Sequence, residues 1–160
     1  MRGITFVTII ILGIVLALTA AGQVTTVKPK PAKDTAAPRM VVKFGPYADS
    51  AKVPASTIKQ IIKSELKITD VKGSVYNVIA YSLWWKRRDI TDDFKTGVPK
   101  TIYLYNSVDV KADPHVPLTW QDEIKGNLQS KEELRFDEIL VQNVKTKKLY
   151  KTNSLTLFIL

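Results

Sequence analysis

Cysteine is absent from this 160-residue sequence, and histidine occurs once, as His115. The lack of cysteine excludes a disulfide scaffold, thiol catalysis, a thiolate zinc site and a lipid-modified cysteine behind a lipoprotein signal. A single histidine cannot form a two-histidine metal pair and leaves little scope for the commonest general base. Packing therefore has to stabilise the fold, and many common catalytic sets are missing.

Motifs for nucleotide binding and nucleophilic catalysis are also missing. The sequence has no G-x-x-x-x-G-K-[ST] loop, no G-x-G-x-x-G turn and no G-x-S-x-G elbow. His115 follows Asp113 by two residues, which is a very weak metal signal. We therefore expect no enzyme activity, no cofactor and no metal. The acidic pairs that could serve a glycosidase have no fixed spacing and are more simply explained as a loop, a helix start and strand flanks: Asp92-Asp93, Asp122-Glu123, Glu132-Glu133 and Asp137-Glu138.

The N-terminal residues 1–22 have the layout of a secretory signal: Arg2, an apolar run over 4–18, then small residues. Cleavage is expected between Gly22 and Gln23, or one residue earlier. The alternative is an uncleaved anchor, because about 18 apolar residues approach the minimum for a spanning helix. Cleavage is favoured because no aromatic or basic anchor follows the run. We expect export to the periplasm, the cell envelope or the medium, with membrane contact only through this segment if it is retained.

Residues 23–38 contain three prolines and almost nothing that could fill a core, which predicts an extended linker. The domain is therefore expected to cover 39–160, and it is long enough for one hydrophobic core. Hydrophobic residues make up 45% of the chain and charged residues 24%, which is typical of a folded domain. The net charge is +9. In an exported protein this favours anionic envelope polymers, lipid headgroups or acidic proteins over nucleic acid, although scattered lysines more often form an ordinary solvated surface.

The first half of the domain predicts a strand over 40–44, stopped by a Gly-Pro turn, and a long central strand over 74–88 with both faces covered. Between them, 53–67 has apolar residues at helical spacing. We expect a short amphipathic helix there, with its apolar face formed by Ile58, Ile61, Ile62 and Leu66.

The second half predicts a polar loop over 87–100, a strand over 101–110 and a helix opened by a Thr119–Asp122 capping box. Trp120, Ile124 and Leu128 form the apolar stripe of that helix. In 133–144 the alternation changes phase, and a β-bulge near Asp137-Glu138 would turn all its apolar residues inward. A turn over 145–148 and a buried C-terminal strand follow. About six strands and two short helices predict a mainly antiparallel, two-layer β domain.

Three stretches carry a family resemblance: P-A-S-T-I-K-Q-I-I with V-I-A-Y-S-L, L-T-W-Q-D-E-I leading into L-R-F-D-E-I-L-V, and the lysine-rich turn before L-Y-K-T-N-S-L-T-L-F-I. Together they resemble the C-terminal periplasmic domain of the gliding-motility and type IX secretion family GldM (PorM). The resemblance implies an immunoglobulin-like antiparallel β-sandwich that binds other proteins of a cell-envelope machine. GldM proteins carry further domains and a motor helix, whereas this apolar segment holds no buried charge for proton coupling. The chain resembles an exported, stand-alone copy of the terminal domain.

The strongest local feature is the run Trp84-Trp85-Lys86-Arg87-Arg88. Neighbours on a strand point to opposite faces, so one tryptophan should enter the core while the other lies near the surface beside cations, as an interface hot spot. In the alternative, both rings are covered and the basic triplet only ends the strand in water.

Two functions follow as expectations. The first is a non-enzymatic module that binds envelope proteins, including secretion or motility components. The second is a basic module that binds an anionic envelope polysaccharide or lipid surface. The sequence determines neither the partner nor the oligomeric state.

Overall fold

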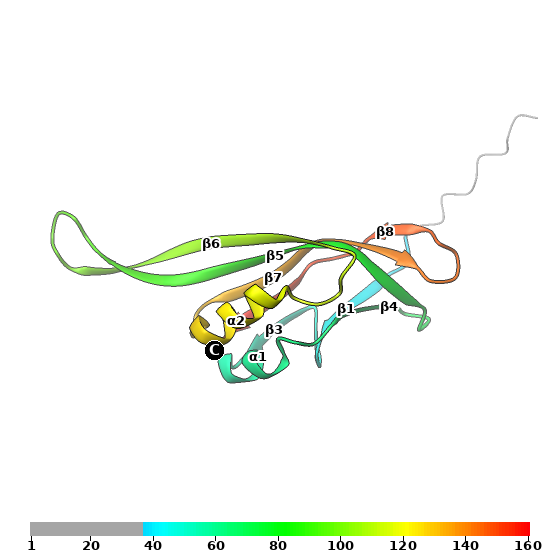
Figure 1. Cartoon of the computed structure of the whole chain (residues 1–160), viewed down its shortest axis with the longest axis horizontal. Coiled ribbons are helices and arrows are strands. Elements are labelled where there is room, and N and C mark those ends of the chain that lie inside the picture. Colours follow the sequence, from blue (N-terminus) through cyan, green and yellow to red (C-terminus); the bar gives the residue numbers. More distant parts are fainter. Residues whose placement is uncertain (1–36) are drawn as a thin grey trace, which may run out of the picture. The chain divides into compact units, whose positions relative to one another are not determined.

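The computed structural model describes residues 37–160, which form a mainly β domain (Figure 1). Its helices are α1 (Ala55–Ile61) and α2 (Leu118–Asn127). Nine strands occur in this range, more than the six expected from the sequence. They are β1 (Met40–Phe44), β2 (Tyr47–Ala48), β3 (Ser50–Val53), β4 (Leu66–Asp70), β5 (Val75–Asp92), β6 (Pro99–Lys111), β7 (Glu133–Asn143), β8 (Leu149–Lys151) and β9 (Leu155–Ile159).

All nine strands belong to one sheet, in the order β2-β1-β4-β5-β7-β9-β3. β6 is a further partner of β5, and β8 is a further partner of β7. The pairs are antiparallel except for β3 with β9. Asp49 brings the two ends together, because its N–H donates to Val42 O (3.4 Å) and its carbonyl accepts from Thr156 N (3.2 Å). The sheet is therefore nearly closed, and an immunoglobulin-like division into two sheets is not confirmed.

The core lies inside this curved sheet. Alternate residues of β1, β4, β5, β7 and β9 point inward, and the two helices add Ile58, Ile62, Ile124 and Leu128. At its centre the Phe136 ring lies 4.9 Å from that of Phe44 and 5.6 Å from that of Tyr81, between centroids. Removing such side chains from water supplies the main stabilising term, at about 1.5–3 kcal/mol each.

The predicted bulge in β7 is confirmed. Between the pairs Ser82–Asp137 and Ala80–Leu140, β7 advances one residue more than β5. Glu138 takes up the extra residue with a φ of 51°, in the left-handed region. As a result the apolar residues on both sides of the bulge are fully buried: Leu134, Phe136, Ile139 and Val141.

Several predicted boundaries are wrong. α1 ends at Ile61, and Leu66 belongs to β4, where Leu66 and Ile68 point inward at strand spacing. A turn closed by Ser64 N donating to Ile61 O (2.7 Å) separates the two elements. α2 starts at Leu118 behind Pro117 and has no side-chain cap, so the Thr119–Asp122 capping box is absent. Its stripe is nevertheless placed as expected, with Ile124 and Leu128 buried and Trp120 half-buried.

The largest correction concerns the expected loop over 87–100. β5 and β6 stay paired up to Asp92–Pro99, and only residues 93–98 form the turn. The hairpin extends beyond the body of the domain, as the left half of Figure 1 shows. Polar composition misled the prediction, because a ribbon with both faces in water also carries polar side chains.

The expected export segment 1–22, its cleavage at Gly22–Gln23 and the linker up to residue 36 lie outside the described residues. Within 37–160, neither helix is long and apolar enough to cross a membrane.

We predict that the bulge residue tolerates glycine better than any β-branched residue. Glu138→Gly should raise the free energy of unfolding by up to about 1 kcal/mol, because glycine adopts a φ of 51° without a Cβ clash. Glu138→Val should lower it by about 1–2 kcal/mol. Urea denaturation of both variants checks this, and equal destabilisation by the two would contradict it.

Candidate functional site

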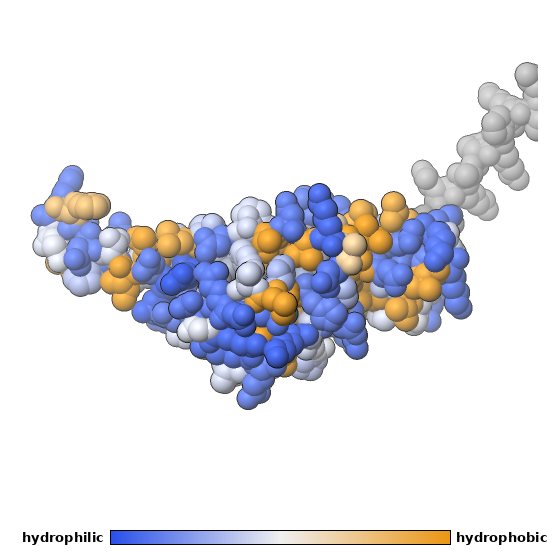
Figure 2. Space-filling view, viewed as in Figure 1, coloured by the Kyte–Doolittle hydropathy of each residue, from blue (hydrophilic) through white to orange (hydrophobic). Residues whose placement is uncertain are grey.

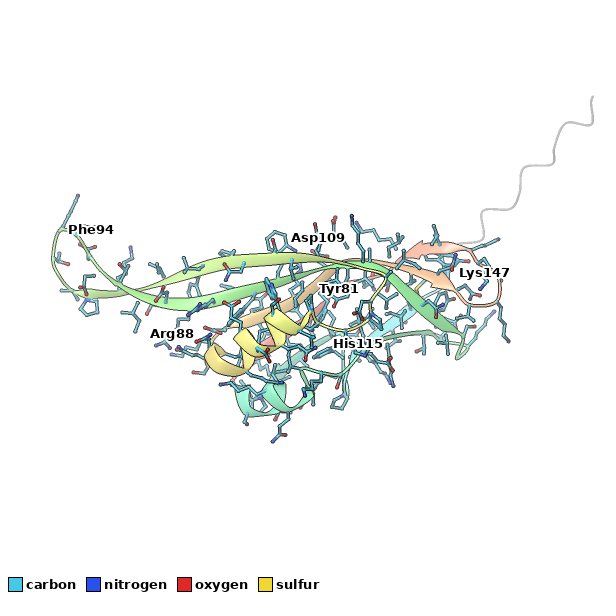
Figure 3. The ribbon with its side chains drawn as sticks, in the orientation of Figure 1. Tyr81, Arg88, Phe94, Asp109, His115 and Lys147 are labelled. Atoms are coloured by element: carbon cyan, nitrogen blue, oxygen red, sulfur yellow. The ribbon has the colours of Figure 1, made fainter. Side chains whose placement is uncertain are left out.

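The registers of β5 with β6 and β7 define a solvent-facing surface, the outer face. Opposite residues of neighbouring strands share a face, so three rows of side chains cross β7, β5 and β6. Figure 3 labels one member of these rows, Asp109. The rows are Asp137, Ser82 and Asp109; Arg135, Trp84 and Ser107; and Glu133, Lys86 and Tyr105.

The two tryptophans lie on opposite sides of the sheet. Trp85 is 1% exposed in the core, whereas Trp84 is 41% exposed on the outer face. This is the arrangement that strand alternation predicts, and the alternative in which both rings are covered is wrong. The expectation that both faces of the central strand are covered fails for the same reason.

The structure also divides the basic triplet between the two faces. Lys86 joins Trp84 on the outer face, where its Nζ lies 4.7 Å from the centroid of the Tyr103 ring. Arg87 points to the other side, over the Trp85 ring (5.7 Å) and 3.8 Å from Glu123 on α2. Arg88 is half-buried, and its Nε is a buried atom with no hydrogen-bond partner among residues 37–160. The five residues therefore do not form one patch.

A shallow groove of about 270 Å³ lies on the outer face. Arg135 Nη2 lies 2.8 Å from Asp137 Oδ2, which places an ion pair at the groove. Aromatic surface next to fixed cations and carboxylates suits contacts that combine stacking with charge-assisted hydrogen bonds. The lining residues are Trp84, Lys86, Tyr105, Glu133, Arg135 and Asp137.

Residues 87–104 form the arm, a two-stranded ribbon beyond the last β5–β7 pair, Lys86–Glu133. Phe94 stands at its tip (Figure 3) and is 105% exposed. Figure 2 shows apolar residues in orange along this ribbon, interleaved with hydrophilic ones. Exposed apolar surface of this extent marks contact sites in soluble proteins. The exposed large hydrophobic residues of the arm are Ile90, Phe94, Val98, Tyr103 and Leu104.

The base of the arm is held by Glu132, which is 2% exposed. Its Oε2 accepts from Trp85 Nε1 (2.8 Å) and Gln129 N (3.1 Å), and its Oε1 accepts from Arg88 N (2.9 Å). No cation pairs with it within residues 37–160, so three N–H donors offset the buried charge. Where β7 separates from β5, this carboxylate takes the place of the β7 backbone as the hydrogen-bond acceptor for a β5 N–H group. The sequence pattern predicts only a strand flank at Glu132, because no neighbouring residue indicates that two of its hydrogen-bond donors come from β5.

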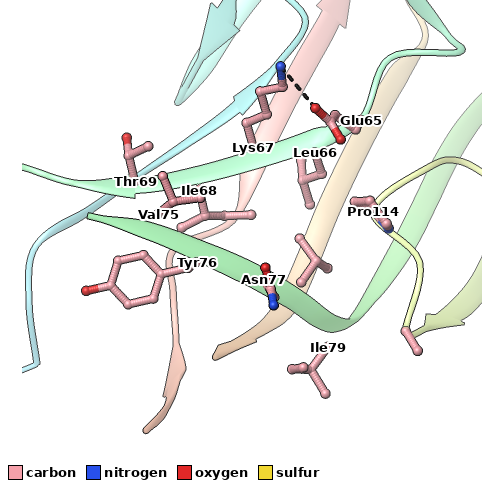
Figure 4. Close-up of a pocket in the computed structure, with 12 residues that line it drawn as sticks. Glu65, Leu66, Lys67, Ile68, Thr69, Val75, Tyr76, Asn77, Ile79 and Pro114 are labelled. Atoms are coloured by element: carbon pink, nitrogen blue, oxygen red, sulfur yellow. Dashed lines mark ion pairs between the residues drawn. The ribbon is translucent and has the colours of Figure 1, made fainter. Parts of the chain in front are cut away.

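A cleft of about 680 Å³ opens between β4 and β5 (Figure 4). The two strands pair only at Ile68–Tyr76 and Thr69–Val75 and then diverge. Residues 112–114 occupy the wide end, where Leu66 N donates to Pro114 O (2.7 Å). Glu65 is the one acidic side chain that lines this cleft, and it pairs with Lys67 at 3.0 Å. The cleft therefore does not bring two carboxylates together.

His115 closes a turn with Asp113. Asp113 Oδ1 accepts from His115 N and lies 2.8 Å from the ring Nδ1, and these contacts lower the pKa of Asp113. Within residues 37–160 no three metal-ligating side chains come together. The pair therefore has a local structural role in this region.

No family model matches the chain, and comparison with curated proteins finds no match either.

We predict that Glu132→Ala lowers the free energy of unfolding by roughly 3 kcal/mol, because it leaves three N–H groups without their acceptor. Glu132→Gln should cost about 1–2 kcal/mol, since one acceptor oxygen remains. Glu65→Ala, which removes an exposed ion pair, is the control and should change stability by less than about 1 kcal/mol. Urea denaturation followed by tryptophan fluorescence measures all three, and a neutral Glu132→Ala would disprove the role of the carboxylate.

Proposed function

We propose that this protein is an exported, non-catalytic module of the cell envelope that binds another envelope protein through its outer face and its arm. The observation that carries the proposal is the exposure of large apolar and aromatic side chains on these neighbouring surfaces, from Trp84 at 41% to Phe94 at 105%. Interface hot spots combine such aromatic residues with arginine, as the outer face does with Arg135.

The export part of this proposal rests on the pattern of residues 1–22. The proposed relationship to the GldM family rests on the three sequence stretches given above, and the immunoglobulin-like β-sandwich that the resemblance implies is part of the same proposal. If the relationship holds, the partner belongs to a secretion or motility machine. The non-catalytic part is supported by the missing motifs and by the single, ion-paired carboxylate of the cleft between β4 and β5.

A second candidate is binding of an anionic envelope polysaccharide. The observation in its favour is the groove itself, where the aromatic residues Trp84 and Tyr105 lie beside the cations Lys86 and Arg135. Binding to an anionic lipid surface would use the same cations. Both forms depend on charge, so salt should weaken them steeply.

The test is retention of envelope components on the tagged protein at low and high salt. We predict that protein partners survive the high-salt wash, and that Trp84→Ala weakens their binding at least tenfold, which corresponds to about 1.4 kcal/mol or more. Leu149→Ala is the matched control, because Leu149 is an exposed apolar residue (57%) on β8, away from the outer face.

Direct binding to an immobilised anionic polysaccharide and to vesicles of anionic lipid forms the second arm of the test. Retention that is lost with salt and with Lys86→Ala would favour the polysaccharide or lipid candidate. Retention of a protein that both Trp84→Ala and Leu149→Ala leave unchanged would remove the outer face from the proposal. Thermal unfolding of each variant controls for loss of fold.

A further inference from the structure

The outer edge of β6 is a long strand edge without a partner among residues 37–160. β6 has 13 residues and pairs with β5 alone. In Figure 1 it lies on the side of β5 opposite β7. Edge strands that remain single are usually shielded by charges, prolines or bulges. Here Pro99, Lys100 and Lys111 stand at the two ends, and the interior carries one charge, Asp109, which accepts a hydrogen bond from Ser82 Oγ (2.6 Å).

Two hydrogen bonds show which backbone groups this edge offers. Ala112 N donates to Ile79 O (2.8 Å) and Asp93 N donates to Val98 O (3.0 Å), so Lys111–Ala80 and Pro99–Asp92 are both non-hydrogen-bonded pairs. Every odd-numbered residue of β6 therefore directs its backbone groups away from β5. Pro99 lacks an N–H at one of these outward positions, which suits an edge strand.

The arm also lacks the stabilising contacts that a third strand would provide. Beyond Lys86 the ribbon has no third strand within the described residues, and two-stranded ribbons are marginally stable in water. The arm half of β6, residues 99–104, lacks a flanking strand, while the body half, residues 106–111, has an open edge. The two halves are equal in length and meet at Tyr105, the middle residue of the strand.

We propose that two copies of this chain pair through β6, antiparallel, about a two-fold axis at Tyr105. In such a pair, residues that lie directly opposite each other in the two copies share a face of the sheet, so their two residue numbers add to an even sum. Only a register centred on Tyr105 pairs the whole strand. Each arm then lies along the body of the other copy. The outward backbone groups form about 12 hydrogen bonds, and two hairpin edges become one continuous sheet.

The side chains are compatible with this register. Tyr105 lies opposite Tyr105 of the second copy. Ile102 lies opposite Val108, which makes an apolar β-branched pair of the kind that stabilises sheets. Lys100 lies opposite Val110, Thr101 opposite Asp109 and Pro99 opposite Lys111, so no like charges oppose each other. Tyr105 is 65% exposed in one copy and would be covered by the second.

The experiment is sedimentation equilibrium of the purified protein alone, over a wide range of concentrations, with charge variants at the two-fold axis. We expect the wild type to be a dimer. Tyr105→Lys and Tyr105→Glu should each be monomeric, because each places like charges opposite each other. An equimolar mixture of the two should form a heterodimer, because opposite charges then meet at the axis.

Three further variants distinguish loss of the dimer from loss of the fold. Ser107→Pro removes an outward N–H and should abolish the dimer, whereas Ser107→Ala should keep it; circular dichroism reports whether each variant is folded. Val71→Lys is the control for an added charge at an exposed apolar site (69%), and it should remain dimeric. A monomeric wild type, or a dimer unaffected by Tyr105→Lys, overturns the inference. The experiment uses the purified protein without any envelope partner. A monomeric result would therefore contradict the proposed dimer and leave the proposed envelope function untouched.

Discussion

The buried carboxylate of Glu132 is the contact on which the geometry of the arm depends. It lies where β7 leaves β5, and it binds the side chain of Trp85, the backbone of Arg88 and the backbone of Gln129. These contacts tie the long hairpin to the segment between α2 and β7. With Trp85 fixed in the core, Trp84 has to face solvent, because adjacent residues of a strand point to opposite sides. The buried carboxylate of Glu132 therefore helps to set which side of β5 presents Trp84 to solvent.

The bulge at Glu138 and the closing contacts of Asp49 act on the other parts of the sheet. The bulge keeps the apolar residues of β7 directed inward on both sides of an inserted residue. Asp49 joins the ends of the sheet through Val42 and Thr156. Together they form a sheet that encloses one core and leaves the opposite side of β5, β6 and β7 open to contact.

Seven of the fourteen exposed large hydrophobic residues within 37–160 lie on the outer face or the arm, and the free edge of β6 runs along both. A module of this construction has separate surfaces for a partner and for a second copy. Side chains would recognise the partner, whereas backbone hydrogen bonds would hold the copy. The outer face and the β6 edge are different sides of the same strands, and they share one residue, Tyr105, which lines the groove and lies at the proposed two-fold axis.

Local pattern determined much of this protein. Residue pattern predicted five of the nine strands, β1, β5, β6, β7 and β9. Alternation within them predicted the bulge at Asp137-Glu138 and the opposite orientations of the two tryptophans, because a strand repeats every two residues regardless of its neighbours. Tertiary structure decided the rest. Arg135, Trp84 and Tyr105 share a face only through the registers of three strands, and the donors of Glu132 lie up to 47 residues away in sequence. Helical spacing wrongly predicted Leu66 to be in a helix, and polar composition wrongly predicted the arm to be a loop. In both cases the side-chain pattern does not determine which backbone groups form hydrogen bonds with a partner strand.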